Sequence, residues 1–389
     1  MLDELPLRDH FVALADVVAR DGGTTYPEIL RGVADDPDVL SLLDHAPVEQ
    51  RRPLILLATV HSMLLAGSAH ELAGYYDTVA AVRGFDFDPP ANDVAEVFRS
   101  FCVEHRRQIE ELVATRATQT NEVGRCTALL PGLCHVAAAV DEAPLSVLDL
   151  GTSAGLNLLF DCYGYTYSDD SGATRTAGDT GSPVQLRCQV RGGLATLPDL
   201  AMPTIHERVG LDLSPIDPSD DDQARWLLAC VWPDNPTRFG RLRGALDIAR
   251  TTTEPARLVQ GDMIEDLDWV ARDMAGDNPL VIFHSWVAAY LSAERQRALV
   301  AAVEALHDVR PVHHLYAESA FETTGLPTPE RPEPLAGADL ATALVHVAPG
   351  SEPVRVADAH PHGNWLRWWT TRRVPTARRG AGEPAPPPG

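Results

Sequence analysis

The N-terminal third of the chain carries the hydrophobic periodicity of α-helices. The apolar run over residues 53–67 begins with proline and ends with glycine, which favour the start and the end of a helix. Apolar residues recur with the helical period over residues 94–112, after Asn92 as a candidate N-cap. Another helix is expected over residues 121–140. Because this part shows no strand-like alternation, we predict an N-terminal helical domain over residues 1–143.

From residue 145 onward, short apolar runs alternate with helical stretches. The expected strands are residues 146–150, 208–213, 257–262, 279–283 and 312–316. The expected helices between them are residues 221–232, 238–250 and 293–307. Strands that alternate with helices predict a doubly wound α/β fold, in which helices cover both faces of a mostly parallel sheet.

Other segments complete the expected organisation. Residues 343–347 and 354–357 flank a Pro-Gly-Ser turn signal and are expected to form an antiparallel pair at the sheet edge. An insert at about residues 161–193 shows the alternation typical of a β-ribbon, or it forms a lid. The Pro-rich segment 376–389 is expected to be disordered. The α/β domain would then cover residues 144–372.

Composition narrows the range of partners. The 389 residues include 55 acidic and 32 basic side chains, no lysine, and a formal net charge of −23. An acidic chain repels phosphate backbones and anionic lipid, so we expect neither a nucleic-acid nor a membrane partner. The longest apolar run is too short for a bilayer, and no signal peptide or CxxC pair is visible. We therefore expect a cytoplasmic protein.

The most informative stretch follows the first expected strand. Asp149, Gly151, Ser153 and Gly155 form an Asp-x-Gly-x-Ser-x-Gly pattern between a strand and the start of a helix. Small residues at such a turn let a ligand approach the backbone amides of a helix N-terminus. The alternative interpretation is a tight strand-to-helix turn of any α/β protein. The pattern lacks the GxGxxG spacing of the dinucleotide-binding fingerprint.

The ends of the later strands carry a matching set of residues. The second expected strand ends at Asp212, the third is followed by Asp262 and Met263, and the fourth by His284. With the small-residue loop, this order resembles the class I S-adenosylmethionine (SAM)-dependent methyltransferases over roughly residues 145–369. The resemblance implies a seven-stranded methyltransferase-like sheet with SAM as the cofactor.

The resemblance also implies which residues bind the cofactor. They are Asp149, Gly151, Ser153, Gly155, Asp212, Asp262 and Met263. Asp212 would accept hydrogen bonds from the ribose hydroxyls, Asp262 would face the adenine amino group, and Met263 would pack on the purine. Two features depart from the family: Ser153 replaces the usual middle glycine, and Asp212 follows Gly151 by 61 residues where about 20 is usual. Asp212 could instead cap the turn before Ser214.

Fewer residues in the sequence indicate where the methyl acceptor would bind. Methyl transfer needs a general base only if the acceptor loses a proton. His284 is the candidate base, because ligands of α/β sheets bind at the carboxyl edge of the strands; the alternative is a histidine bonded to nearby backbone. Trp286 and Tyr290 are candidate walls of the acceptor pocket, with core packing as the alternative for each.

Polar residues ahead of the third expected helix are further candidates. In methyltransferases the element before the first strand often folds over the cofactor, so Asn121, Glu122 and Arg125 are candidates to contact the acceptor or the amino-acid end of SAM. A capped helix start is the alternative. Residues 119–125 and 231–234, with the small-residue loop, also resemble a bacterial family of unknown function, DUF2332, which implies no reaction.

Metal chemistry finds no support in the sequence. His313 and His314 would point to opposite faces of a strand, and no carboxylate or cysteine stands at ligand spacing from them. Asp234 is expected to cap the helix that follows it.

These observations lead to one expected function and several alternatives. We expect SAM-dependent methyl transfer to a small-molecule acceptor, in a pocket shaped by the helical domain and the insert. The first alternative is a protein of the same fold that binds SAM or a nucleoside without catalysis. An NAD(P)-linked oxidoreductase and a purely structural protein are the others. The sequence does not indicate the oligomeric state.

Overall fold

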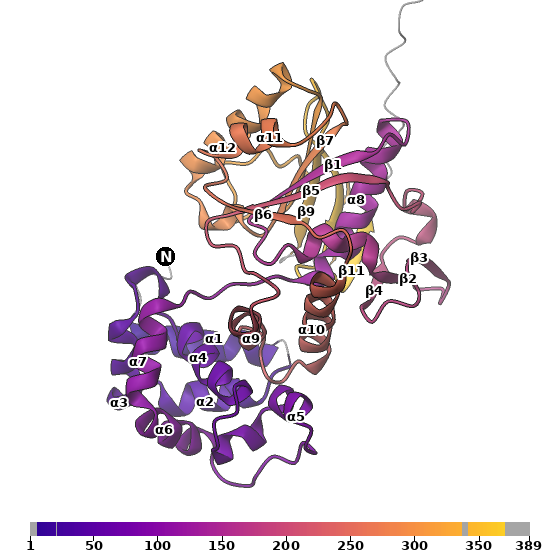
Figure 1. Cartoon of the computed structure of the whole chain (residues 1–389). Helices are drawn as coiled ribbons and strands as arrows, with labels where there is room; N and C mark the ends of the chain where they lie inside the picture. The colour runs from indigo at the N-terminus through magenta and orange to yellow at the C-terminus, as the bar shows by residue number, and fades with distance from the viewer. Residues whose placement is uncertain (1–5, 21, 337–340, 370–389) are drawn as a thin grey trace, which may run out of the picture.

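The computed structural model of the chain describes residues 6–20, 22–336 and 341–369. The helices of the N-terminal part form one group, and the strands form a single sheet beside it (Figure 1). The segment predicted to be disordered lies outside the described residues.

In the described residues of the N-terminal part, short 3₁₀ turns accompany seven α-helices, which we call the helical bundle. They are α1 (Leu7–Arg20), α2 (Thr25–Val33), α3 (Pro37–Leu40), α4 (Pro53–Leu65), α5 (Asp77–Arg83), α6 (Val94–Glu104) and α7 (Arg106–Thr115). The apolar helix α4 is the expected one, and it is buried on all sides because it has no polar face. Asp93, not Asn92, caps α6 by accepting from the amide of Ala95. The expected helix over residues 94–112 is broken at His105.

The helix α8 (Cys126–Ala139) precedes the first strand but packs on the sheet. A 3₁₀ turn, Val123–Arg125, leads into it, and it lies against strands that are far away in the sequence. The division of the chain at residue 143 remains a prediction. In space, the polypeptide leaves the helical bundle before α8 begins (Figure 1).

The described part of the chain forms one mixed sheet of eleven strands. In sequence order they are β1 (Leu145–Leu150), β2 (Gly164–Ser168), β3 (Thr174–Gly178), β4 (Gln185–Val190), β5 (Ile205–Asp212), β6 (Arg257–Gln260), β7 (Leu280–Ser285), β8 (Val312–Ser319), β9 (Thr342–Val347), β10 (Val354–Ala359) and β11 (Trp365–Trp368). Their spatial order is β3-β2-β4-β11-β10-β9-β8-β7-β1-β5-β6. The five core strands β6-β5-β1-β7-β8 are parallel, as the alternating pattern predicts.

Two details of the predicted sheet are wrong. The antiparallel pair β9 and β10 is interior, because β11 pairs with β10 and the insert continues the sheet beyond β11 through β4. The sheet therefore exceeds the seven strands expected. The insert forms the ribbon predicted for it, since β2 pairs with both β3 and β4 as outer strands of the same sheet, and these strands form no lid.

Successive residues of the core strands point to opposite faces of the sheet, and each face packs against its own apolar layer. Val147, Val281 and Leu315 belong to the core that contains α8 and the helical bundle. Leu148 and Ile282 point to the opposite face. There they pack against α11 (Leu267–Asp273) and α12 (Ala293–Ala305). Helices thus cover both faces of the parallel core.

The connection from β5 to β6 leaves the sheet and joins the helical bundle. Its first helix, α9 (Asp221–Ala229), packs on α4, and its second, α10 (Pro236–Thr251), contacts α5 (Figure 1). Asp234, between them, accepts hydrogen bonds from the amides of Thr24 and Thr25 at 2.9 and 3.1 Å, so it anchors the start of α2. The prediction that Asp234 caps the next helix is wrong, because Asn235 caps α10.

A membrane-crossing helix would need a longer apolar segment than any helix in the described part of the chain offers.

Candidate functional site

A cleft of about 580 Å³ lies between the helical bundle and the carboxyl ends of the core strands. Gly151 follows β1, Asp212 ends β5 and Ser285 ends β7, and all three line it. Tyr26 and Leu57 of the helical bundle form part of the opposite wall. The chain order reverses between β1 and β7, which is the switch point where open α/β sheets bind ligands.

The loop after β1 adopts a backbone that leaves little freedom. Gly151 has φ +71°, and a Cβ there would come within 2.3 Å of Val287 Cγ2, so only glycine fits. Ser153 has φ +53°, a left-handed conformation that is unfavourable for a residue with a side chain. Its Oγ donates to Gln119 Oε1 at 3.0 Å, so the hydroxyl is held by the segment that leads into α8. Both residues line the cleft.

Asp212 holds two loops together with its carboxylate. Oδ2 accepts from the amide of Ser153 and Oδ1 from the amide of Ser214, both at 2.8 Å. Gln119 Nε2 donates to the carbonyl of Ser214 at 2.8 Å and closes the ring. A carboxylate has about four acceptor positions, so these two bonds leave Asp212 able to accept from a ligand in the cleft. The two sequence interpretations, cap and ligand-facing carboxylate, are therefore compatible.

Three predicted site residues lie beneath or behind the loop. Asp149 is buried and accepts from Thr152 Oγ1 at 2.9 Å; burial raises the pKa of its carboxyl to about 8. Asn121 accepts from the amide of Leu156 at 3.1 Å and donates to the carbonyl of Thr152 at 3.3 Å. Gly155 lines a separate cavity of about 490 Å³. These residues shape the loop and do not line the cleft.

The residues after β6 divide between the cleft and the surface of α12. Met263 lines the cleft. Asp262 does not: its Oδ1 accepts from the amide of Ile264 at 2.8 Å, and its Oδ2 pairs with Arg295 Nη2 at 2.6 Å. The structure thus brings Met263, but not Asp262, into the cleft.

His284 is separated from the cleft. Its ring is fully buried, with Nδ1 2.7 Å from Glu318 Oε1 and Nε2 3.1 Å from His314 Nε2. Burial and neighbouring histidines hold the pKa of His314 well below its usual value. Glu318 Oε1 also accepts from the amides of Val287 and Ala288 at 3.1 and 3.2 Å. Because both ring nitrogens are engaged and the ring does not line the cleft, the structure does not support His284 as a base acting on a ligand.

Arg125 and Trp286 form the wall of the cleft at the end of β7. Arg125 Nε donates to the carbonyl of Pro361 at 3.2 Å, and Nη1 to the carbonyl of Ser285 at 3.0 Å. Its guanidinium lies 6.0 Å from the ring of Trp286. Trp286 has φ +56°, and its Nε1 donates to Thr342 Oγ1 at 2.8 Å. Strained residues of this kind concentrate at ligand sites, and Trp286 lines the cleft.

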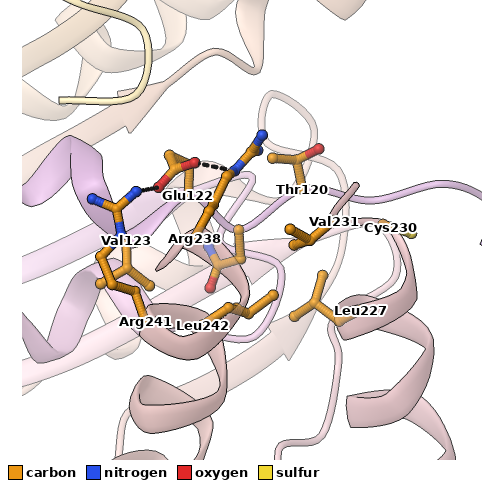
Figure 2. A pocket seen from close by; sticks show the side chains of 10 residues that line it. Thr120, Glu122, Val123, Leu227, Cys230, Val231, Arg238, Arg241 and Leu242 are labelled. Carbon is orange, nitrogen blue, oxygen red and sulfur yellow. Dashed lines mark ion pairs between the residues drawn. The ribbon is translucent and has the colours of Figure 1, made fainter. Parts of the chain in front are cut away.

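Glu122 is buried among basic groups behind Arg125. Its Oε2 lies 2.5 Å from Arg238 Nε, and its Oε1 lies 3.7 Å from Arg241 Nη2 (Figure 2). Oε2 also lies 3.3 Å from His362 Nδ1. Burial alone would raise the pKa of this carboxyl, but Arg238, His362 and Arg241 together hold the pKa well below its usual value. The adjoining cavity of about 10 Å³ has room for roughly one water. Glu122 is thus an ion-pair centre and does not line the cleft.

Arg238 and His362, which line the cleft beside Arg125, were not predicted. Tyr290, a candidate wall of the acceptor pocket together with Trp286, also lines the cleft, and 82% of its surface is exposed. No local pattern could identify Arg238 or His362, because they come from α10 and from the turn after β10. Gln119 was available as a signal, since it stands in the polar segment before α8.

Metal ligands do not gather in the described residues, which contain no group of three or more His, Cys, Asp and Glu placed to hold an ion. His313 bonds to His346 at 3.0 Å, while His314 faces His284, so the two histidines point to opposite faces as predicted.

The fold and the cleft define an α/β protein with a ligand-sized site at the switch point of its sheet. The chain belongs to a family described as an uncharacterised protein conserved in bacteria (DUF2332), whose profile matches residues 8–368. The match confirms the resemblance to DUF2332 that was drawn from the sequence. No curated protein matches the chain.

Proposed function

We propose that the cleft binds SAM and that the protein transfers the methyl group to a small-molecule acceptor. One observation carries this proposal: the loop of Gly151 and Ser153 and the carboxylate of Asp212 meet in one cleft at the switch point between β1 and β7. This combination suits a nucleoside, because backbone close to the ligand and a carboxylate for hydroxyl groups are both present.

The residues present fit such a cofactor in most respects. Gly151 lets the backbone face the cleft without a side chain, and Met263 supplies apolar surface for a purine. Ser153, in place of a glycine, keeps its hydroxyl turned to Gln119. Asp262 is held by Arg295, so Asp212 is the carboxylate to which we assign ligand binding.

SAM supplies an electrophilic methyl group, and the protein's task is to hold an acceptor in line with it. Positioning of this kind contributes most when water is excluded and the reacting atoms are held close. The helical bundle closes the cleft opposite the loop, and Trp286 and Tyr290 offer rings beside it. We assign no general base, because His284 is walled off.

A second candidate function follows from that same separation. If the acceptor must lose a proton, the base expected at His284 is absent from the cleft. A protein that binds SAM or its product as a signal, without transfer, is compatible with this geometry. A broad acceptor screen with radiolabelled SAM separates the two functions, since only the enzyme transfers label.

Calorimetry with S-adenosylhomocysteine tests the proposed site directly. We expect micromolar binding, about −8 kcal/mol, for the wild-type protein. Asp212→Asn should weaken it at least tenfold, because an amide replaces one acceptor oxygen with a donor. The matched control is Asp220→Asn, which removes the same charge at the N-cap of α9, where asparagine also caps well. Failure of the wild-type protein to bind at millimolar ligand would overturn the proposal.

A further inference from the structure

Basic groups converge at one end of the cleft, although the chain as a whole has a net charge of −23. Arg125, Arg238 and His362 all line this end, and Arg241 shares the carboxylate of Glu122 with Arg238 and His362. They come from the turn before α8, from α10 and from the turn after β10. Such an assembly in an acidic protein marks a place where a negative charge is expected.

The carboxylate of Glu122 does not balance all of this charge. Arg238, Arg241 and His362 already share its two oxygens. Arg125 makes no ion pair with a carboxylate among the residues that the structure describes. Its guanidinium is held instead by the carbonyls of Pro361 and Ser285, which fix its plane without neutralising its charge.

Glu318 is the other carboxylate in the neighbourhood of Arg125. Its Oε1 is bonded to the ring of His284 and to the amides of Val287 and Ala288. Burial lowers the pKa of the Arg125 guanidinium, and the more distant charges of Glu122 and Glu318 only oppose this effect. A partly buried arginine without a carboxylate partner is costly unless a ligand supplies the anion.

We propose that Arg125, with Arg238 beside it, is a binding site for the carboxylate group of a small ligand in the cleft. A planar guanidinium held at fixed orientation suits bidentate binding of a carboxylate. Arg125 is bonded to the end of β7, and Asp212 ends β5, two strands away across β1. At about 4.8 Å per strand, the ends of β7 and β5 lie roughly 10 Å apart, a span that one small molecule can bridge.

Two ligands offer this chemistry, and the inference rests on the proposed function only for the first. The amino-acid end of SAM carries a carboxylate, and so would an acceptor that is an organic acid. In either case the site selects a ligand with a carboxylate over its uncharged counterpart.

The test uses two pairs of probes that differ in the carboxylate. S-Adenosylhomocysteine is compared with 5′-deoxy-5′-methylthioadenosine, which has the nucleoside without the amino-acid end. Benzoate is compared with benzamide, with the nucleoside present in excess. Calorimetry is run on the wild-type protein, Arg125→Gln, Arg125→Lys and the control Arg107→Gln, whose side chain is 91% exposed on α7. Thermal unfolding verifies that each variant is folded. If Arg125→Gln does not fold, the comparison is made with Arg125→Lys.

We expect Arg125→Gln to weaken at least one carboxylate probe tenfold or more, with its uncharged partner and the Arg107→Gln control unchanged. Arg125→Lys should show a smaller loss, because it keeps the charge but not the planar fork. If Arg125→Gln weakens the binding of S-adenosylhomocysteine, the carboxylate that Arg125 binds belongs to the cofactor. If it weakens the binding of benzoate, the carboxylate belongs to the acceptor. Arg125-dependent benzoate binding without any nucleoside binding would leave the carboxylate site standing while the proposed function fails. Equal binding of both carboxylate probes to wild-type and Arg125→Gln proteins, or no binding of either to the wild type, overturns the inference.

Discussion

Ser153 shows how a single residue connects backbone strain to the site. It adopts the left-handed conformation that glycine favours, while its amide donates to Asp212 and its hydroxyl to Gln119. The strain is of the order of 1 kcal/mol or more, and the hydroxyl bond returns a similar amount. The sequence pattern could identify the position as a glycine replacement, but not the bond to Gln119 that accompanies it.

This balance predicts that two substitutions of Ser153 differ in their effect on the free energy of unfolding. Ser153→Gly relieves the strain and loses one hydrogen bond, so its free energy of unfolding should lie within about 1 kcal/mol of the wild type. Ser153→Val places a β-branched side chain at φ +53° and should cost about 2 kcal/mol or more. Urea denaturation measures both, and equal stability of the two variants would contradict the strain argument.

Glu122 makes a prediction about acid stability. Its folded pKa lies below the unfolded value of about 4.3, so its contribution is present above that pH and is lost as the pH falls. Glu122→Gln leaves Arg238 and Arg241 without a carboxylate and should cost about 3 kcal/mol at pH 7. The cost should shrink toward pH 3. The exposed Glu111→Gln should change stability by no more than about 0.5 kcal/mol, and a similar loss in both variants would contradict this assignment.

The pKa shift of Asp149 is opposite in sign to that of Glu122, so its effect on stability has the opposite pH dependence. Its folded pKa of about 8 lies above the unfolded value of about 3.9, so the folded state retains a proton that the unfolded state releases. Wild-type stability should therefore decline from this residue as the pH rises from about 4 to 8. Asp149→Asn cannot ionise and still offers an oxygen to Thr152, so its stability relative to wild type should increase between pH 5 and pH 8. A constant difference, measured by urea denaturation across that range, would show that Asp149 is already charged.

At the level of elements, the strands and helices with a clear hydrophobic period were predicted, and so was the antiparallel pair β9 and β10. The way the insert joins the sheet was not predicted. The parallel core strands and the helices α4, α8 and α12 lie near their expected positions, since periodicity is local information. The pairing of β4 with β11 joins residues more than 170 positions apart, so no local pattern could reveal that the insert extends the sheet. The residues of the site likewise fall into those that the sequence could identify and those that it could not. The loop and Asp212 were accessible to motif analysis, whereas Arg238 and His362 depend on how distant turns pack.

The contact of α9 with α4 should contribute substantially to stability. Leu227 on α9 is 1% exposed, so Leu227→Ala should cost about 2–4 kcal/mol through lost burial and the cavity left behind. The exposed Asp221→Asn on the same helix should cost less than about 1 kcal/mol. Denaturant titration of both variants tests whether α9 is packed as described; near-equal losses would contradict it.

The molecule as a whole shares one apolar core across the helical bundle and one face of the sheet. Buried residues from Phe11 to Trp368 belong to the same cluster. Sharing a core predicts cooperative unfolding, so differential scanning calorimetry should show one transition for the whole chain. Two well-separated transitions would show that the helical bundle is stable on its own.

The path of the chain between β5 and β6 also makes the helical bundle discontinuous in sequence. A fragment ending at residue 143 would omit α9 and leave α4, apolar on every side, open to water. Such a fragment would associate through that surface instead of remaining monomeric. In chimaeras between relatives, α9 and α10 must therefore come from the same parent as the N-terminal helices. A single crossover point would separate helices that pack together.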